Sequence, residues 1–92
     1  MENQLKQIIK HYGIMKQLKY IHSEYFELDE AILNYISKDE NMYQDREHIA
    51  EEIADVMVML EQFRLYYDID KETINNLMEY KINRQIERIE NE

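Results

Sequence analysis

Apolar residues recur in steps of three or four positions along most of the chain, the spacing typical of amphipathic helices. The first such run covers residues 5–12 and stops at Gly13, the only glycine, where we expect a helix to end or kink. A second run extends from residue 14 to about residue 37, with apolar positions at Leu18, Ile21, Tyr25, Leu28, Ile32 and Tyr35. The pattern therefore predicts a short helix followed by a long one.

The segment of residues 37–45 is polar and aperiodic, which predicts a loop. Beyond it a third helix is predicted, with apolar positions on one line at Ile49, Ile53, Val56, Leu60, Phe63 and Tyr67. Asp68 and Asp70 border a short turn, and Asp70 is a candidate N-cap for a fourth helix through Ile74, Leu77, Met78, Ile82 and Ile89. Short connections favour antiparallel neighbours, so the expected fold class is an all-α antiparallel bundle of about four helices.

Composition agrees with this expectation and limits the possible partners. The 92 residues contain no proline and no cysteine, and they are expected to form one domain, residues 1–92. We find no leader segment and no apolar run long enough to span a membrane, so a cytoplasmic location is expected. The net charge of −9 opposes binding to nucleic acid polymers. The apolar faces are broad for so short a chain, which predicts a homodimer or homotetramer formed through helix faces.

Two pairs of acids lie close to the predicted apolar faces. On the second helix, Glu24 lies at the edge of the apolar arc and Glu27 just beyond it. On the third helix, Glu52 lies inside the apolar arc and Asp55 flanks it on the same side. Residues three apart on a helix face the same way, so each helix offers a pair of carboxylates.

If these two helices pack antiparallel, the four carboxylates converge at their interface. Bringing four anions out of water is unfavourable unless something neutralises them, and a divalent cation does so. A set of ligands made only of oxygen atoms favours Mg²⁺, with Mn²⁺ and Ca²⁺ as alternatives, over zinc. The sequence thus predicts a metal site, and Mg²⁺ at such a site accepts phosphate oxygens as further ligands.

Basic residues of the last helix give a candidate phosphate contact. Lys81, Arg84 and Arg88 follow one another at helical spacing and continue the line of Leu77. The alternative interpretation is an ordinary helix end, where cations are favourable near the negative pole of the helix dipole. His11, Tyr12 and Gln17 are further candidates, for contacts with the base or sugar of a nucleotide.

These residues resemble the MazG-like nucleotide pyrophosphohydrolases of the all-α NTP pyrophosphatase superfamily, over most of the chain. The family hallmark is E-x-x-E, a spacer and E-x-x-D, which here is Glu24 to Glu27, 24 intervening residues, and Glu52 to Asp55. The flanking words "ELDEAI" and "EEIADVMVML" and the K-x-x-R at Lys81 are similar as well, and "HYGIMKQLKYI" resembles small, often phage-borne, members. Ser23 departs from the family, since many members have another Glu there.

The resemblance implies a helical bundle in which the four acids bind Mg²⁺ and a nucleoside triphosphate is hydrolysed to monophosphate and pyrophosphate. Water would attack the α-phosphorus, Lys81 and Arg84 would hold phosphates, and Glu27 or Glu52 would accept the proton. One alternative is a non-catalytic helical interaction module with the same fold, for which an exposed Glu52 would argue. Another is a di-iron bundle, but this needs E-x-x-H on two helices, and the nearest approach is the D-x-x-H of residues 45–48.

Overall fold

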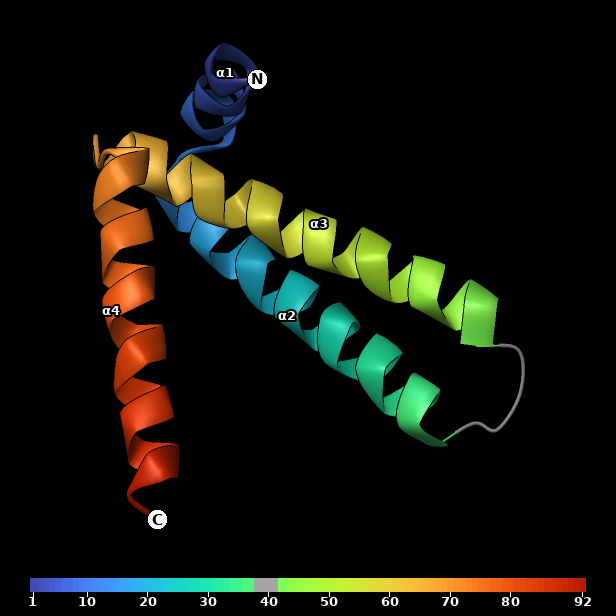
Figure 1. The fold of residues 1–92 in the computed structure, drawn as a ribbon. Helices are drawn as coiled ribbons and strands as arrows, with labels where there is room; N and C mark the ends of the chain where they lie inside the picture. Colours follow the sequence, from blue (N-terminus) through green and yellow to red (C-terminus); the bar gives the residue numbers. More distant parts are fainter. Residues whose placement is uncertain (38–41) are drawn as a thin grey trace.

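The computed structural model describes residues 1–37 and 42–92, with the side chains of all of these except residues 42–45. Over these residues the chain forms four α-helices and no strand: α1 (Glu2–Tyr12), α2 (Ile14–Ser37), α3 (Met42–Tyr66) and α4 (Lys71–Glu90) (Figure 1). The all-α class and the order of the helices are confirmed. The predicted loop over residues 37–45 is wrong for residues 42–45, which begin α3. No glycine or proline lies there to prevent a helix; residues 38–41 lie outside the described residues.

Two residues with positive φ mark the ends of helices. Gly13 has φ +87° and separates α1 from α2, while its N–H donates to the carbonyl of Ile9 over 2.8 Å. This confirms that the chain breaks at Gly13, a conformation that glycine adopts more readily than other residues. After α3, Asp68 has φ 53°, and the N–H of Ile69 donates to the carbonyl of Arg64 over 3.0 Å. This pattern is a Schellman-type helix end.

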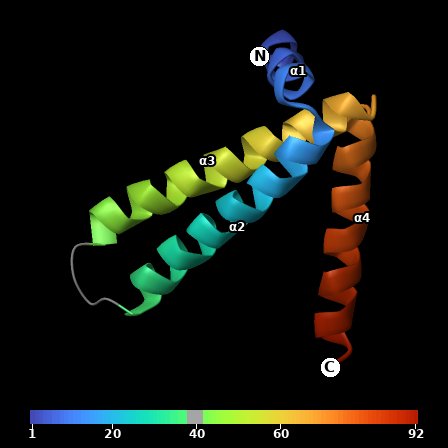
Figure 2. The same ribbon diagram turned by 180° about the vertical axis from the view of Figure 1, so that it is seen from behind.

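α2 and α3 form a long antiparallel hairpin, and the other two helices lie at the end where α2 begins and α3 finishes (Figures 1 and 2). α1 lies across the end of the hairpin at which α2 begins and α3 finishes, where it packs on both helices. α4 starts from the same end and diverges from the hairpin. Asp70 stands at the N-cap position of α4, as predicted, although its side chain makes no capping hydrogen bond. Among the described residues, no helix combines the length and the apolar character needed to cross a membrane.

The contact between α2 and α3 buries a mixture of apolar and polar side chains. The buried apolar residues of the described chain are Ile9, Ile21, Ala31, Val56 and Met59, and the buried polar ones are Gln17, Glu24, Glu52, Gln62 and Arg64. The predicted apolar lines are therefore only partly the buried faces. Ile53 and Leu60 were expected on the packed face of α3, yet they are 43% and 46% exposed. Pairing with α2 has instead turned the side bearing Glu52 and Met59 inward.

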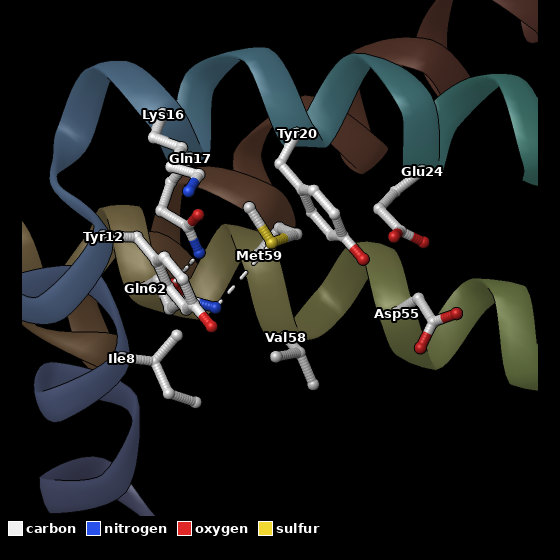
Figure 3. A pocket seen from close by; sticks show the side chains of 10 residues that line it. All are labelled: Ile8, Tyr12, Lys16, Gln17, Tyr20, Glu24, Asp55, Val58, Met59 and Gln62. Atoms are coloured by element: carbon white, nitrogen blue, oxygen red, sulfur yellow. Dashed lines mark hydrogen bonds between the residues drawn. The ribbon is translucent and has the colours of Figure 1, made fainter.

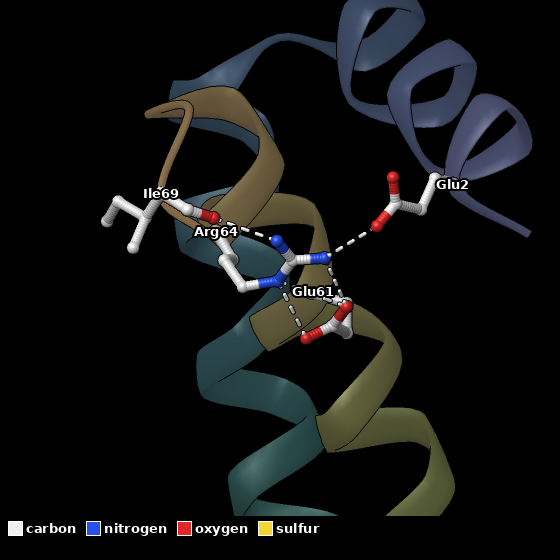
Figure 4. A network of polar contacts seen from close by, with 4 residues as sticks. All are labelled: Glu2, Glu61, Arg64 and Ile69. Carbon is white, nitrogen blue, oxygen red and sulfur yellow. Dashed lines mark hydrogen bonds and ion pairs between the residues drawn. The ribbon is translucent and has the colours of Figure 1, made fainter. Parts of the chain in front are cut away.

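Arg64 ties three parts of the fold together (Figure 4). Its guanidinium donates to both carboxylate oxygens of Glu61 on α3, with distances of 2.9–3.2 Å. The same group donates to Glu2 of α1 over 3.0 Å and to the carbonyl of Ile69, in the turn before α4, over 2.8 Å. Hydrogen bonding to Glu61 and Glu2 raises the pKa of Arg64, which stays charged, so this buried cation is matched by two anions.

α4 leaves nearly all of its surface exposed. Ile74 is half-buried, and every other residue of the helix is exposed. The exposed side chains include the large apolar residues Leu77, Met78, Tyr80, Ile82, Ile86 and Ile89. Within one chain, the predicted fourth helix therefore exists but has no extensive apolar contact with the hairpin.

Candidate metal centre and adjoining pocket

The register of the α2–α3 hairpin places functional side chains opposite one another. Glu24 of α2 lies near Asp55 of α3, and seven residues along, Gln17 of α2 hydrogen-bonds Gln62 of α3. Seven residues are close to two full turns of an α-helix, so both pairs lie along the same seam. The shared seam explains why acids and amides that are far apart in the sequence form one continuous strip.

The four predicted metal ligands come together in this hairpin. Ligand oxygens of Glu24, Glu27, Glu52 and Asp55 all lie within 4.8 Å of one another. Glu24 and Glu52 are buried, with 5% and 8% exposure, while Glu27 and Asp55 are exposed. The cluster therefore has a fixed inner side and an outer side open to solvent.

One oxygen of each inner carboxylate lacks the partner that a buried acid normally has. Glu24 Oε2 and Glu52 Oε2 are both buried, and neither has a hydrogen-bond partner among the described residues. Burial is the main cause that raises the pKa of Glu24, with smaller contributions from Asp55 and Glu27. Burial also raises the pKa of Glu52, and the charges of Glu27 and Asp55 add to the rise. A bound cation would reverse both effects by supplying the missing positive charge.

The donor set fits a hard divalent cation. All four side chains offer carboxylate oxygens, which Mg²⁺ and Mn²⁺ prefer. Opposite oxygen ligands of Mg²⁺ lie about 4.2 Å apart, twice the usual bond length. No two ligand oxygens of the cluster are more than 4.8 Å apart, so contact with one ion requires them to approach by less than about 1 Å.

His48 and Tyr20 lie next to the cluster but are not among its four ligand residues. His48 Nδ1 lies 3.9 Å from Glu52 Oε1, one turn away on α3, and its side chain is mostly exposed. Tyr20 lies one turn before Glu24 on α2, and hydrogen bonding to Glu24 is the main cause that raises the pKa of Tyr20. The histidine-containing ligand set of di-iron bundles is not formed by the described side chains. Asp45, the acid of the D-x-x-H alternative, lies outside them.

A pocket of about 430 Å³ opens along the seam next to the acids (Figure 3). Glu24 and Asp55 line one end of it. Gln17 and Gln62 line the other end, with Tyr20 and Met59 between the two ends. α1 closes the side of the pocket with Ile8 and Tyr12, and Lys16 lies 5.0 Å from the centre of the Tyr12 ring. The metal cluster and the pocket are thus parts of one site.

Of the residues expected near a base or sugar, Gln17 and Tyr12 line this pocket. His11 does not, and its ring packs edge-on against Tyr12 at 4.7 Å. The sequence did not single out Gln62, which is only 1% exposed and donates to Met59 Sδ over 3.7 Å. The register of the acids contains the missing signal: if Glu24 lies opposite Asp55, seven residues back from Glu24 is Gln17 and seven beyond Asp55 is Gln62.

Lys81, Arg84 and Arg88 do not join the acids within one chain. All three are exposed on α4, and the ion pairs formed by the described residues include none of them. Arg84 lies 5.8 Å from the ring centre of Tyr80 on its own helix. Contact of the three cations with a phosphate held at an acid cluster would therefore require the cluster of a second chain, or a movement of α4 toward the cluster of its own chain.

No protein-family model, curated protein or solved structure matches the chain. Functional assignment therefore depends on the chemistry of the cluster and the pocket and on the motif spacing in the sequence.

Proposed function

We propose that the protein is a Mg²⁺-dependent nucleoside triphosphate pyrophosphohydrolase that acts in nucleotide-pool control, converting a ribo- or deoxynucleoside triphosphate and water to the monophosphate and pyrophosphate. The observation that carries this proposal is the pair of buried carboxylate oxygens, on Glu24 and Glu52, that lack any partner within a cluster of four acids. The resemblance to MazG-like enzymes rests on the same four acids. A pocket beside them offers room for the rest of a nucleotide.

The residues divide the chemistry between them. A divalent cation held by Glu24, Glu27, Glu52 and Asp55 would supply neutralisation of phosphate charge and a more acidic water. Because Glu24 and Glu52 are buried, they fix the position of the site, whereas Glu27 and Asp55 face the side from which phosphates arrive. Glu27 or Glu52 would accept the proton of the attacking water, and Glu27 is the more exposed of the two.

The covalent step is a substitution at the α-phosphorus. The oxygen of water adds to phosphorus while Glu27 or Glu52 takes its proton, and the bond from the α-phosphorus to the bridging oxygen breaks. Pyrophosphate leaves with the bonding electron pair. The electron pair and the proton are thus both accounted for without an oxidant or a further reactant.

The site is proposed to be completed by a second copy of the chain. Lys81, Arg84 and Arg88 are suited to phosphate, but α4 does not pack its stripe against the acids of its own chain. α4 contains four Lys or Arg and four Glu, so the net charge of −9 lies on the rest of the chain. This charge difference favours docking of α4 on the acidic hairpin of a partner, in a homodimer or homotetramer.

The non-catalytic interaction module is the alternative from the sequence. It was expected to have an exposed Glu52, but Glu52 is 8% exposed. Keeping an unpaired carboxylate at that position is unfavourable for a protein that uses its acids only as a surface.

The direct test is Mg²⁺-dependent release of pyrophosphate from a panel of ribo- and deoxynucleoside triphosphates. We expect release from at least one of them, and Glu52→Gln should reduce the rate by about 100-fold or more, as is typical when a general base or a ligand of a catalytic metal is lost. The matched control is Glu51→Gln, which removes the same charge from the exposed neighbouring position. No release from the whole panel, or equal rates for wild type and Glu52→Gln, would contradict the proposal.

A further inference from the structure

We propose that the paired amides of Gln17 and Gln62 form a nucleobase-binding site, so that the ligand lies along the α2–α3 seam with its base on the amides and its phosphate at the four acids. The inference rests on the proposed function for the identity of the phosphate end. The base end is argued from the pocket itself.

The two amides have unused hydrogen-bonding capacity. Gln17 Nε2 donates to Gln62 Oε1 over 2.8 Å, and Gln62 Nε2 donates to the weak acceptor Met59 Sδ. Each amide has two N–H donors and an acceptor oxygen. Gln17 Oε1 therefore accepts no hydrogen bond from the described residues, although Gln17 is only 5% exposed and lines the pocket. Buried amides that keep free donors and an acceptor toward a cavity are suited to a polar, planar ligand.

The distance between the two ends of the site suits a nucleotide. Gln17 and Glu24 are seven residues apart on α2, and Gln62 and Asp55 are seven apart on α3, which corresponds to about 10 Å along each helix. A nucleoside 5′-phosphate has its hydrogen-bonding base at one end, its phosphate at the other, and a single sugar between them. Its chemistry therefore matches the order of groups along the pocket.

The walls between the two ends of the pocket suit a base in shape and charge. Tyr12 and Tyr20 bring aromatic rings to the side of the pocket, and Met59 provides a polarisable floor. Aromatic rings suit the flat face of a base, while amides suit its edge, because every base carries a donor beside an acceptor. Lys16 is the one basic residue among those that line the pocket, so a second phosphate-rich end at the amides is disfavoured.

Binding of nucleotide products tests this inference without relying on turnover. Nucleoside 5′-monophosphates and ribose 5-phosphate, which lacks a base, are titrated into the full chain with Mg²⁺, and the side-chain amide resonances of Gln17 and Gln62 are followed by NMR. We expect at least one monophosphate to bind about 10- to 100-fold more tightly than ribose 5-phosphate, the size of one or two hydrogen bonds plus stacking. Only the monophosphate should shift the glutamine amide resonances.

The variant Gln17→Leu should remove the preference for the monophosphate over ribose 5-phosphate while leaving Mg²⁺ binding, measured separately, unchanged. If that variant does not fold, the amide shifts of the wild-type protein decide the question. Equal affinity for the two phosphates, no binding of either, or tight binding of a monophosphate with unmoved glutamine amides would overturn the base site. A protein that binds monophosphates through the amides but releases no pyrophosphate from triphosphates would keep the base site and contradict the proposed enzymatic function.

Discussion

At the scale of single residues, Glu24 occupies a position that is unfavourable without a cation. Its Oε2 is buried and unpaired among the described residues, and burial raises its pKa. We therefore expect Glu24→Gln to raise the free energy of unfolding in EDTA by about 1 kcal/mol, because the amide removes a buried charge from the cluster. Glu52→Gln should act in the same direction.

Magnesium should reverse the order of stability. At a concentration 100 times its dissociation constant, a ligand of the native state adds about 2.7 kcal/mol, which the wild type should gain and the two variants should largely lose. Urea unfolding with EDTA and with Mg²⁺ measures both effects. Glu30→Gln, an exposed position on α2, controls for the change in net charge. A variant that is less stable than wild type in EDTA would show that the buried carboxylate is not under electrostatic strain.

At the scale of elements, Glu61 pairs with Arg64 on α3. Arg64 also donates hydrogen bonds to Glu2 of α1 and to the turn before α4, so the pair supports the contact between these elements. Hydrogen bonding to Arg64 lowers the pKa of Glu61, with weaker help from Lys71. The folded protein thus binds fewer protons at Glu61 than the unfolded chain, so this stabilisation is complete above about pH 4.5, the unperturbed value, and is lost as the pH falls below it.

Comparing wild type with Glu61→Gln as a function of pH tests this network. We expect the variant to be less stable at neutral pH by about 0.5–1 kcal/mol, a small value because Glu61 is one-third exposed and screened by solvent. The difference should shrink as the pH falls below about 4.5. Glu51→Gln, exposed on the same helix and free of ion pairs among the described residues, should show no such convergence. A difference that is independent of pH would rule out the ion pair as its source.

The same scale shows what sequence patterns can and cannot predict. The boundary at Gly13 was predictable because it depends on one residue with positive φ, and the four-acid cluster because it depends on spacing within each helix. The start of α3 was not predictable, since polar residues without glycine or proline suit a loop or a helix end equally well. The burial of Gln62 was not predictable either, because it depends on the pairing of α2 with α3 and not on the apolar pattern of either helix.

At the scale of the whole molecule, the single chain has an open shape. Its radius of gyration is 16.4 Å, compared with about 12 Å for a compact domain of this length. The apolar side of α4 is exposed, including Met78, Ile82 and Ile89. A second copy of the chain that packs on this side would bury these apolar residues. The basic stripe of Lys81, Arg84 and Arg88 lies on the adjacent side of α4 and would then contact the second copy.

We therefore expect a homodimer or homotetramer at micromolar concentration by light scattering, and dissociation by Ile82→Glu. Asn83→Glu adds the same charge about 100° around α4 from Ile82, outside the line of Met78, Ile82 and Ile89, and should leave the assembly intact. A monomeric wild type, or equal effects of the two variants, would contradict assembly through this face.

Mixing two inactive variants then tests whether the stripe serves the partner. One chain carries Glu52→Gln, and the other carries Lys81→Ala, Arg84→Ala and Arg88→Ala. If the stripe acts across the interface, a mixed assembly contains one site with intact acids from one chain and intact cations from the other, so pyrophosphate release should return. If each stripe serves its own chain, every site in the mixture lacks either its acid or its cations, and no release should appear. The two outcomes separate a shared site from a movement of α4 within one chain.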